Sequence, residues 1–583
     1  MEKDLRIIFS AVKNNKEALP KNIILDGLDK GTAVKGKKVA FISVSDLENR
    51  ALVFKGRGKD IREATCEALK KCADRFSKKK NPPRAVKFDV VTRFRPVSQE
   101  NNICKPGTDP IVYKKNFDGL ALDEHADVAI LPEEVDANKV LRNSRLQKDG
   151  LIRALKRHHF EGKEVVLDLL EQAKELTLYK FRTKGYYVDE TMACKLYRGH
   201  RMFYDLREQE LKKELVKAIQ WTKDYYFKNV VQESGRLIYS FLADENRAEK
   251  RYNILRHAGT TYAMWQVYEM MPDKELYSKA KAATEYLARQ VKELEVGGED
   301  TRVLAERETY KLGGNGLGLV ALAKYSKVTG DKQYLPLMQK MARWIELSQS
   351  ENGHFPYHKL SYPSGEPFDF ECAYYPGEAM LGLLRLYELD KNPEWIDVAE
   401  KAADYIVSER SETGEVSVRH DHWLLYSFNE LYRHRPKDEY IDHTLLIADS
   451  MEAVQVDEAE HPDLIGGYKG NFLKPIPKTP SANGSAFHGE GLCAAYKLVR
   501  DFYSAQRAEK IRKTVEKGIK FQLQHHLRPE NAMYYKNQKL CLGGVRRSFR
   551  GHDILIDCVQ HNISCFIEYI DGAPPEISKK ESC

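Results

Sequence analysis

Mostly apolar helical stretches alternate with more charged ones from residue 252 to about residue 569. A short polar turn follows each apolar stretch. The charged stretch after the turn opens with a large side chain, at Leu276, Tyr334, Trp395 and Tyr440, and a weaker fifth unit follows near Ala508. Recurrence of this kind in a helical region predicts helical hairpins that stack on one another.

The first helix of each hairpin is apolar almost all round, which places it in an inner layer rather than on the face of an open solenoid. Further helices are expected at 208–229 and 556–570, which brings the total to roughly a dozen. An inner ring of helices within an outer ring satisfies this pattern. We therefore predict a mainly α protein with an (α/α)6 toroid over residues 205–572.

Residues 1–175 show a different pattern, in which short β-rich runs flank a single amphipathic helix. The expected strands lie at 38–44, 50–54, 85–92 and 126–132, and the expected helix lies at 60–77. This order predicts a small α+β domain before the toroid, and the sequence leaves its role open. We expect residues 176–204 to form a strand-rich connector and residues 573–583 to form a flexible tail.

Composition narrows the class of protein. The chain has 583 residues, a formal net charge of +8 and ten cysteines without a CxxC pair. No apolar run is long enough to span a membrane, and the N-terminus lacks the apolar core of a signal peptide. We therefore expect a cytoplasmic protein with reduced thiols and no membrane partner. Basic residues gather between Lys70 and Arg84, but few aromatic side chains lie among them, so we expect no nucleic-acid partner.

Two phrases in the helical region resemble known families. The first is Tyr252-Asn253-Ile254-Leu255-Arg256-His257-Ala258-Gly259-Thr260, which resembles a phrase of toroid proteins related to sugar epimerases. The second, Gln349-Ser350-Glu351-Asn352-Gly353-His354-Phe355, resembles the Q-x-x-x-G-x-W turn of terpene cyclases and related toroids, with Phe355 in place of Trp.

The whole stretch 205–572 resembles the (α/α)6 superfamily. That superfamily includes N-acylglucosamine 2-epimerases, glucuronyl C5-epimerases, many glycoside hydrolases and the lanthionine cyclases. The zinc-binding Cys and Cys-His pairs of the cyclases and the DxDD motif of terpene cyclases are not evident. The resemblance implies a sugar or oligosaccharide substrate and proton transfer by histidines at the rim of the toroid.

Polar residues gather where the apolar helices are expected to begin. Inner helices of a toroid are parallel, so these starts share one rim, where helix dipoles favour negative charge. Histidine and carboxyl side chains suit proton transfer, and arginine suits a carboxylate, a phosphate or a developing enolate. The candidate catalytic residues are His257, His422, His488, His561, Glu378, Glu490 and Asp421. The candidate substrate-binding residues are Arg256, Asn315, His354, Tyr374, Tyr375, Trp423, Arg547 and Asp557.

Simpler roles stay open for several of these residues. Asp421 and Asp557 would also serve as helix caps, and a histidine at an inner-helix start is often buried with its hydrogen bonds satisfied. The glycines at the same starts would also serve close helix packing. A metal among the histidines is conceivable, but no HExxH motif is present, so we expect neither a metal nor another cofactor.

Three classes of function remain, and the first is an enzyme that acts on sugars. The histidines favour an enzyme that moves protons on sugars, that is, an epimerase or isomerase. The carboxylates keep a glycoside hydrolase open. An enzyme that modifies a peptide or another polymer, with the N-terminal domain holding the substrate, and a non-catalytic binding scaffold are the further alternatives. The sequence leaves the sugar, the stereocentre and the oligomeric state open.

Overall fold

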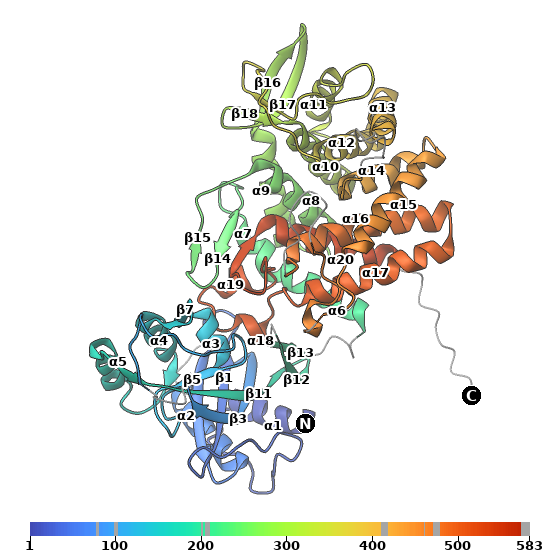
Figure 1. Ribbon diagram of the computed structural model, residues 1–583. Helices are drawn as coiled ribbons and strands as arrows, with labels where there is room; N and C mark the ends of the chain where they lie inside the picture. The colour runs from blue at the N-terminus through green and yellow to red at the C-terminus, as the bar shows by residue number, and fades with distance from the viewer. Residues whose placement is uncertain are drawn as a thin grey trace, which may run out of the picture. The chain divides into compact units, whose positions relative to one another are not determined.

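The computed structural model describes residues 1–76, 81–97, 103–199, 202–204, 210–409, 418–459, 461–469 and 479–572. The chain divides into two compact units (Figure 1). The N-terminal unit comprises Met1–Glu210, Leu242–Arg247 and Leu527–Leu542. The helical unit comprises Leu211–Phe241, Ala248–His526 and Gly543–Cys583. Leu242–Arg247 and Leu527–Leu542 therefore belong to the N-terminal unit, although they lie within the sequence range predicted for the toroid.

Six helices of the helical unit form a closed inner ring. They are α8 (Ile254–Met270), α10 (Leu312–Thr329), α12 (Tyr375–Asp390), α14 (His422–Tyr432), α16 (Ala482–Phe502) and α20 (Ile556–Gly572). Each packs against the next, and α20 packs against α8, which closes the ring. This circular set of contacts confirms the predicted toroid.

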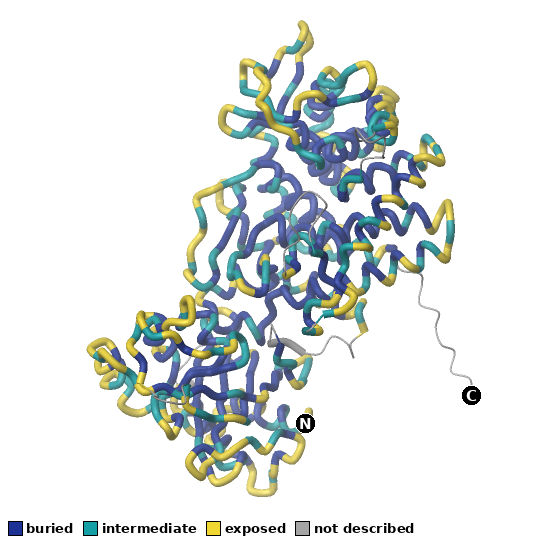
Figure 2. The backbone as a smooth tube through the Cα atoms, in the orientation of Figure 1, coloured by how far each residue is buried: buried dark blue, intermediate teal, exposed yellow. Residues whose placement is uncertain are grey.

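A second helix covers each inner helix from outside. The outer helices are α9 (Lys274–Arg289), α11 (Leu335–Leu347), α13 (Pro393–Ser408), α15 (Asp438–Ala453), α17 (Ala505–Leu523) and α6 (Leu211–Trp221). The first five follow their inner partners in the chain, whereas α6 packs on α20. Figure 2 shows the inner helices buried along most of their length and exposed backbone concentrated in the connections.

Glycines let neighbouring inner helices approach to backbone contact. A Cβ atom at Gly316 of α10 would lie 2.2 Å from the carbonyl oxygen of Glu378 on α12. A Cβ atom at Gly382 of α12 would lie 2.6 Å from the carbonyl oxygen of Gly316. Both distances are far below normal contact, so these two helices need glycine where they cross. The packing role that the sequence left open for Gly316 is therefore the one the structure shows.

Two local features of the helical unit differ from the sequence prediction. Helix α16 begins at Ala482, where the Ser481 hydroxyl accepts a hydrogen bond from the Gly484 amide at 3.0 Å, so the prediction of a start near His488 is wrong. In addition, β16 (Val291–Val296), β17 (Glu299–Glu306), β18 (Thr309–Lys311) and β19 (Lys359–Ser361) form an antiparallel sheet that the sequence analysis missed. Three of these strands lie between α9 and α10.

The N-terminal unit is built on a mixed sheet, as the prediction of a small α+β domain requires. Its main path runs β13–β12–β11–β3–β1–β2–β9. The strands are Met202–Tyr204, Ala193–Arg198, Tyr179–Asp189, Ala85–Pro96, Lys38–Ser45, Leu52–Gly58 and His158–His159 in that order. Helix α2 (Ile61–Phe76) packs on β1 and β2, and the apolar side chains between them form the core. Of the strand expected at 126–132, only Ala129–Ile130 (β6) is present.

Residues 176–204, which we expected to connect the two regions, instead supply strands to this sheet. Strand β11 pairs antiparallel with β3 from Tyr179 opposite Pro96 to Asp189 opposite Ala85. Strand β12 then pairs with β11, and β13 with β12. The segment is held by ladder hydrogen bonds inside a sheet, which a sequence pattern of aromatic residues alone could not distinguish from a surface connector.

Some expectations fall outside the described residues. They include Lys78, Lys79 and Lys80 of the basic cluster and the tail at 573–583.

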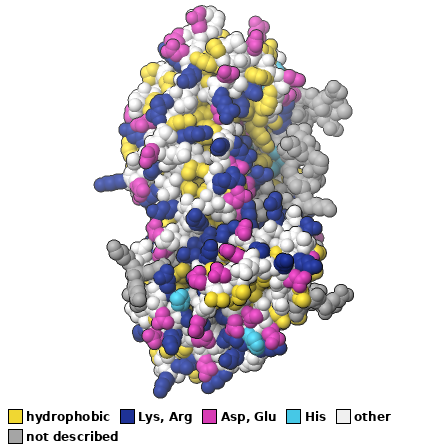
Figure 3. Space-filling view, turned by 90° about the vertical axis from the view of Figure 1, so that its left-hand side faces the viewer, with side chains coloured by type: hydrophobic (Ala, Val, Ile, Leu, Met, Phe, Trp, Pro, Cys, Tyr) yellow, Lys and Arg dark blue, Asp and Glu magenta, His cyan; other side chains and the backbone are white. Residues whose placement is uncertain are grey.

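The surface in Figure 3 carries Lys and Arg side chains together with Asp and Glu side chains. Within the described part of the chain, no helix combines the length and hydropathy that crossing a membrane requires.

Candidate active site

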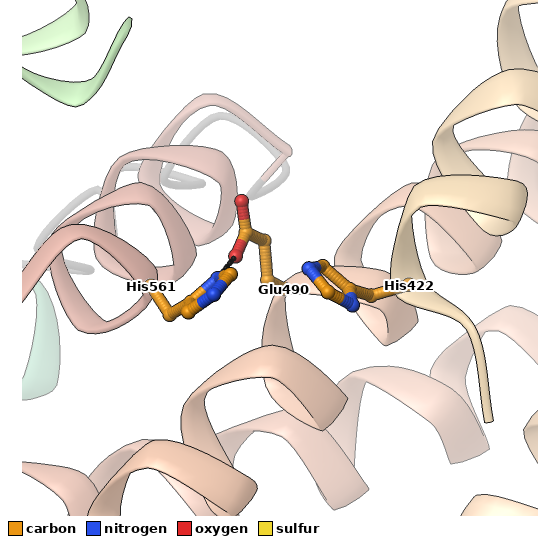
Figure 4. Close-up of side chains that lie close together, drawn as sticks. All are labelled: His422, Glu490 and His561. Carbon is orange, nitrogen blue, oxygen red and sulfur yellow. Dashed lines mark hydrogen bonds and ion pairs between the residues drawn. The ribbon is translucent and has the colours of Figure 1, made fainter. Parts of the chain in front are cut away.

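Three titratable side chains from three consecutive helices of the ring meet near its axis. They are His422 on α14, Glu490 on α16 and His561 on α20, and Figure 4 shows them approaching one another. One donor atom from each lies within 4.8 Å of the other two. The Glu490 Oε2 and His561 Nδ1 atoms are 2.7 Å apart. All three residues are at most 3% exposed, so the group lies in the interior of the ring.

The neighbours of this trio are mainly aromatic. The Tyr426 hydroxyl donates a hydrogen bond to Glu490 Oε1 at 3.3 Å. The His422 ring lies 4.5 Å from the Trp423 ring and 5.5 Å from the Phe487 ring, centroid to centroid. Neither ring nitrogen of His422 has a hydrogen-bond partner among the described residues. A buried polar group in this state is uncommon and indicates a role other than stability.

A cation and two carboxyl groups lie at the same end of the ring. The Arg256 Nε atom is 3.6 Å from Asp557 Oδ2, at the starts of α8 and α20. The Arg256 side chain is 31% exposed, whereas Glu378 on α12 is buried, and Glu378 Oε2 has no hydrogen-bond partner in the described part of the chain. Arg256 therefore offers a positive charge that a ligand could reach.

Burial dominates the electrostatics of this group. It raises the pKa of Glu378 to about 8, with Arg256 opposing the rise and Asp421 adding to it. It lowers the pKa of His422 and His561 well below the usual range, and the charge of Arg256 lowers both further. Near neutral pH the site therefore combines a protonated carboxyl group, neutral imidazoles and a guanidinium.

Three candidate residues contribute to the helix starts and the aromatic wall. Asp421 caps α14, because its Oδ1 atom accepts a hydrogen bond from the Trp423 amide at 2.9 Å, and burial raises its pKa to about 8. The Tyr374 ring stands edge-on to the His422 ring at 5.9 Å. Trp423 packs 5.9 Å from His561. The capping role that the sequence left open for Asp421 is present, and its carboxyl still lies near Glu378.

Three candidate residues point elsewhere. His257 lies between α8 and α9, where its Nδ1 atom is 2.6 Å from the Tyr252 hydroxyl and its Nε2 atom is 2.9 Å from the Ala283 carbonyl oxygen. Asn315 ties α10 to β17 by accepting a hydrogen bond from the Leu304 amide at 2.7 Å. Arg547 is 3.6 Å from Asp553 and its side chain is 56% exposed. The structure does not bring these three into the trio.

His488 forms a second histidine group. Its Nε2 atom is 3.0 Å from His420 Nδ1, and its Nδ1 atom donates a hydrogen bond to the Gly484 carbonyl oxygen at 2.6 Å. The ring stacks on Tyr468 at 4.7 Å, and burial lowers its pKa to about 3. His488 is therefore hydrogen-bonded through both nitrogens and lies beside the trio rather than in it.

A small pocket lies next to this end of the ring. Its volume is about 160 Å³, and His354, His358, Glu371, Tyr405 and Glu409 are among the residues that line it. The Tyr375 ring lies 5.8 Å from the His358 ring at its edge. His354 and Tyr375 thus lie around this pocket instead of at the trio.

A larger cavity, of about 400 Å³, lies at the opposite end of the ring. Side chains from the C-terminal parts of all six inner helices line it, among them Glu269, Lys324, Arg385, Glu430, Lys497 and Glu568. The sequence analysis placed the pocket only at the N-terminal rim and did not anticipate this one.

Two residues of the site were missed in the sequence. Tyr426 lies four residues after His422, on the same face of α14, so helical spacing could have found it. Gly313 leaves the space that the Glu378 carboxyl occupies, because a Cβ atom there would lie 1.8 Å from Glu378 Oε2. No local sequence signal identifies that contact.

Comparisons with known proteins find similarity of structure only. No protein-family model matches the chain, and no curated protein matches it. A cellobiose 2-epimerase from Bacillus thermoamylovorans B4167 is similar with a TM-score of 0.48 and 12% identity, over 62% of this chain and 99% of that chain. A D-mannose isomerase is similar with a TM-score of 0.47 and 13% identity, over 63% of this chain and 100% of that chain. The α-1,6-mannanase GH76A from Salegentibacter sp. HEL1_6 is similar with a TM-score of 0.43 and 14% identity, over 62% of this chain and 100% of that chain. These neighbours are sugar epimerases, isomerases and glycoside hydrolases, as the resemblance in the sequence implied.

Proposed function

We propose that the helical unit is a carbohydrate-active enzyme, and that it is a sugar epimerase or isomerase acting by proton transfer. The observation that carries this proposal is the placement of Arg256, Glu378 and His422 at one end of the inner ring. Two of the three, Glu378 and His422, are buried with polar atoms that have no hydrogen-bond partner among the described residues. The sugar as substrate class rests on the resemblance of residues 252–260 to epimerase-related toroids.

The chemistry needs a base, an acid and a positive charge. Removing a proton from the carbon beside a sugar carbonyl breaks a C–H bond, and its electron pair moves onto the carbonyl oxygen. The Arg256 guanidinium would stabilise the negative charge that develops there. Returning the proton to the other face of the same carbon gives an epimer. Returning it to the former carbonyl carbon gives an isomer, provided that the carbonyl oxygen gains a proton and the hydroxyl on the first carbon loses one to become the new carbonyl. Glu378 and the imidazoles of His422 and His561 are the groups that would carry the proton.

Deuterium incorporation tests the proposal directly. The protein would be incubated in heavy water with a panel of reducing sugars and uronic-acid oligosaccharides, and the products followed by NMR. We expect deuterium at a single carbon, and we expect Glu378→Gln to lower its incorporation at least about 100-fold. Glu269→Gln, at the opposite end of the ring, is the matched control and should retain activity. If the wild-type protein exchanges no proton on any substrate of the panel, the epimerase assignment fails.

A glycoside hydrolase is the second candidate. Glu378 and Asp421 are electrostatic neighbours, and burial raises the pKa of both to about 8. Hydrolysis of a glycosidic bond requires one protonated carboxyl group and one carboxylate, so one of these two groups would have to ionise in the complex with substrate. New reducing ends without deuterium incorporation would favour this candidate.

We also propose a cytoplasmic location, because the ten cysteines include no CxxC pair.

A further inference from the structure

We infer that His422, Glu490 and His561 form a binding site for one divalent transition-metal ion of the Zn²⁺ type. The inference goes beyond the proposed function and contradicts our expectation that no metal is bound. Its first support is convergence: α14, α16 and α20 are consecutive in the ring, and each presents one donor to the same point (Figure 4).

Close helix packing fixes this convergence. A Cβ atom at Gly491 would lie 2.8 Å from the Cβ atom and 2.9 Å from the Cα atom of His422. The glycine next to Glu490 therefore lets α14 and α16 approach until the imidazole and the carboxylate face one space. The ligand atoms lie within 4.8 Å of one another. With Zn²⁺ at about 2.0–2.1 Å from each ligand atom, neighbouring ligand atoms are about 3.4 Å apart. The Glu490 Oε2 and His561 Nδ1 atoms, now 2.7 Å apart, would therefore separate slightly, and the His422 nitrogen would move inward.

The second support is the lack of partners around the trio. Both His422 nitrogens are buried without a hydrogen-bond partner in the described part of the chain, although a histidine ring normally uses at least one. A metal ion would take one of these nitrogens. Among the described residues, no Lys or Arg pairs with Glu490, and the His561 imidazole beside it is neutral near neutral pH, so an ionised Glu490 would lack a compensating positive charge. A divalent cation would supply that compensation.

The donor set identifies the class of ion. Two imidazoles and one carboxylate, with room for further ligands, suit Zn²⁺, Fe²⁺ and related divalent ions, whereas Ca²⁺ and Mg²⁺ prefer oxygen donors. The Tyr426 hydroxyl, 3.3 Å from Glu490 Oε1, holds the second carboxylate oxygen and so orients the first. Support of a ligating carboxylate by a hydrogen-bond donor is typical of protein metal sites.

A bound ion would also change the roles within the proposed function. The imidazoles of His422 and His561 would then hold the ion, and Glu378 would be left to carry the proton. The ion would polarise a carbonyl or hydroxyl oxygen of the sugar. This consequence rests on the proposed function, whereas the metal site itself does not.

Metal binding is measured without any substrate. The purified protein would be stripped with a chelator, loaded with Zn²⁺, desalted and analysed by mass spectrometry, with affinity obtained by competition against a chromophoric chelator. We expect one Zn²⁺ per chain, and we expect His422→Ala, His561→Ala and Glu490→Gln each to weaken binding at least about 100-fold. Tyr426→Phe should weaken it roughly 10-fold. Loading with Co²⁺ should give visible absorption bands that the three ligand variants lose.

Two buried histidines serve as controls for folding and for binding elsewhere. His257→Ala removes a buried histidine on α8, and His488→Ala removes one partner of the His420 pair. Both variants should keep one Zn²⁺ per chain. The inference is overturned if wild-type protein retains no ion, or if the three ligand variants bind Zn²⁺ as tightly as the two controls. Proton exchange on a sugar by metal-free protein would leave the proposed function intact without the metal. Binding of Zn²⁺ by a protein that reacts with no sugar would support the metal site and contradict the proposed function.

Discussion

The two ends of the inner ring hold charge in opposite ways. At the C-terminal end, the cavity of about 400 Å³ is walled by ion pairs, such as Arg385 with Glu430 at 2.5 Å and Lys324 with Glu269 at 2.5 Å. At the N-terminal end, His422 and Glu378 are buried, and polar atoms of both have no hydrogen-bond partner in the described part of the chain. The larger space thus lies where charges are satisfied.

This difference shows why cavity size alone does not locate chemistry. Paired charged side chains that also contact water cost the folded state little free energy, and their ionisation is little suited to proton transfer. Buried polar atoms without partners cost of the order of 1–3 kcal/mol each, and proteins retain that cost mainly where function requires it. The comparison therefore favours the N-terminal end of the ring as the active site.

The largest expected effect is on activity. Arg256→Ala removes the only guanidinium that we place at the trio, and it should lower kcat/KM by about 100- to 1,000-fold, the usual loss when one electrostatic stabiliser is removed. Arg433→Ala, at the C-terminal cavity, should change kcat/KM less than about threefold. The measurement is the rate of deuterium incorporation or of product formation for both variants. Equal losses at both ends would remove the distinction between them.

The pH dependence of stability should also separate the two ends. Glu378 has a pKa of about 8 in the folded protein, against 4.5 for an ordinary glutamate. The folded state therefore binds more protons than the unfolded state between these values, so the free energy of unfolding should fall as pH rises from about 4.5 to 8. One group contributes a slope of up to about 1.4 kcal/mol per pH unit.

Glu378→Gln should remove this contribution and leave a flatter curve in urea unfolding at a series of pH values. Asp421, whose pKa burial also raises to about 8, contributes with the same sign, so part of the slope should remain in the variant. Identical slopes in wild type and variant would show that Glu378 is ionised in the folded protein.

The ring could be predicted from the sequence because each inner helix is apolar all round and recurs at a regular place in its hairpin. The sheet of β16–β19 was missed because its first strands lie between two predicted hairpins, in a stretch to which the sequence analysis gave no structure. A local signal was present, since Gly297-Gly298, a pair typical of hairpin turns, joins β16 to β17. The sheet in the N-terminal unit needed long-range pairing of β11 with β3, which no local pattern reveals.

The candidate site was predicted only in part, and Arg256 and His257 show why. Adjacent helix residues point about 100° apart, so one faces the ring axis and the other faces α9. Because an inner helix is buried on every side, hydrophobicity does not distinguish the two directions. Likewise, Gly313 matters only through its contact with Glu378, which is distant in sequence. The residue types in the sequence indicated which end of the ring carries the candidate residues. Only the packing of the helices showed that His422, Glu490 and His561 meet there.

A smaller effect is expected on stability in the metal-free protein. His422→Leu replaces a buried ring, which has no hydrogen-bond partner among the described residues, by an apolar side chain of similar size, so the free energy of unfolding should rise by roughly 1 kcal/mol. His257→Leu is the matched control. It leaves the Tyr252 hydroxyl and the Ala283 carbonyl without their partner, and it should cost about 2–3 kcal/mol. Chemical unfolding in the presence of a chelator measures both, and destabilisation by His422→Leu as large as that by His257→Leu would indicate an unrecognised partner of His422.

The smallest effect concerns the rim of the C-terminal cavity. Arg433 pairs with Asp501 at 2.7 Å, but their side chains are 39% and 26% exposed, so water screens the attraction. A double-mutant cycle with Arg433→Ala and Asp501→Ala should give a coupling free energy of about 0.2–1 kcal/mol, and less in high salt. Such a value agrees with an end of the ring whose charges serve solubility and local order. A coupling well above 1 kcal/mol that persists in high salt would mean that these charges are held in a dry, organised site, and the two ends would no longer differ in kind.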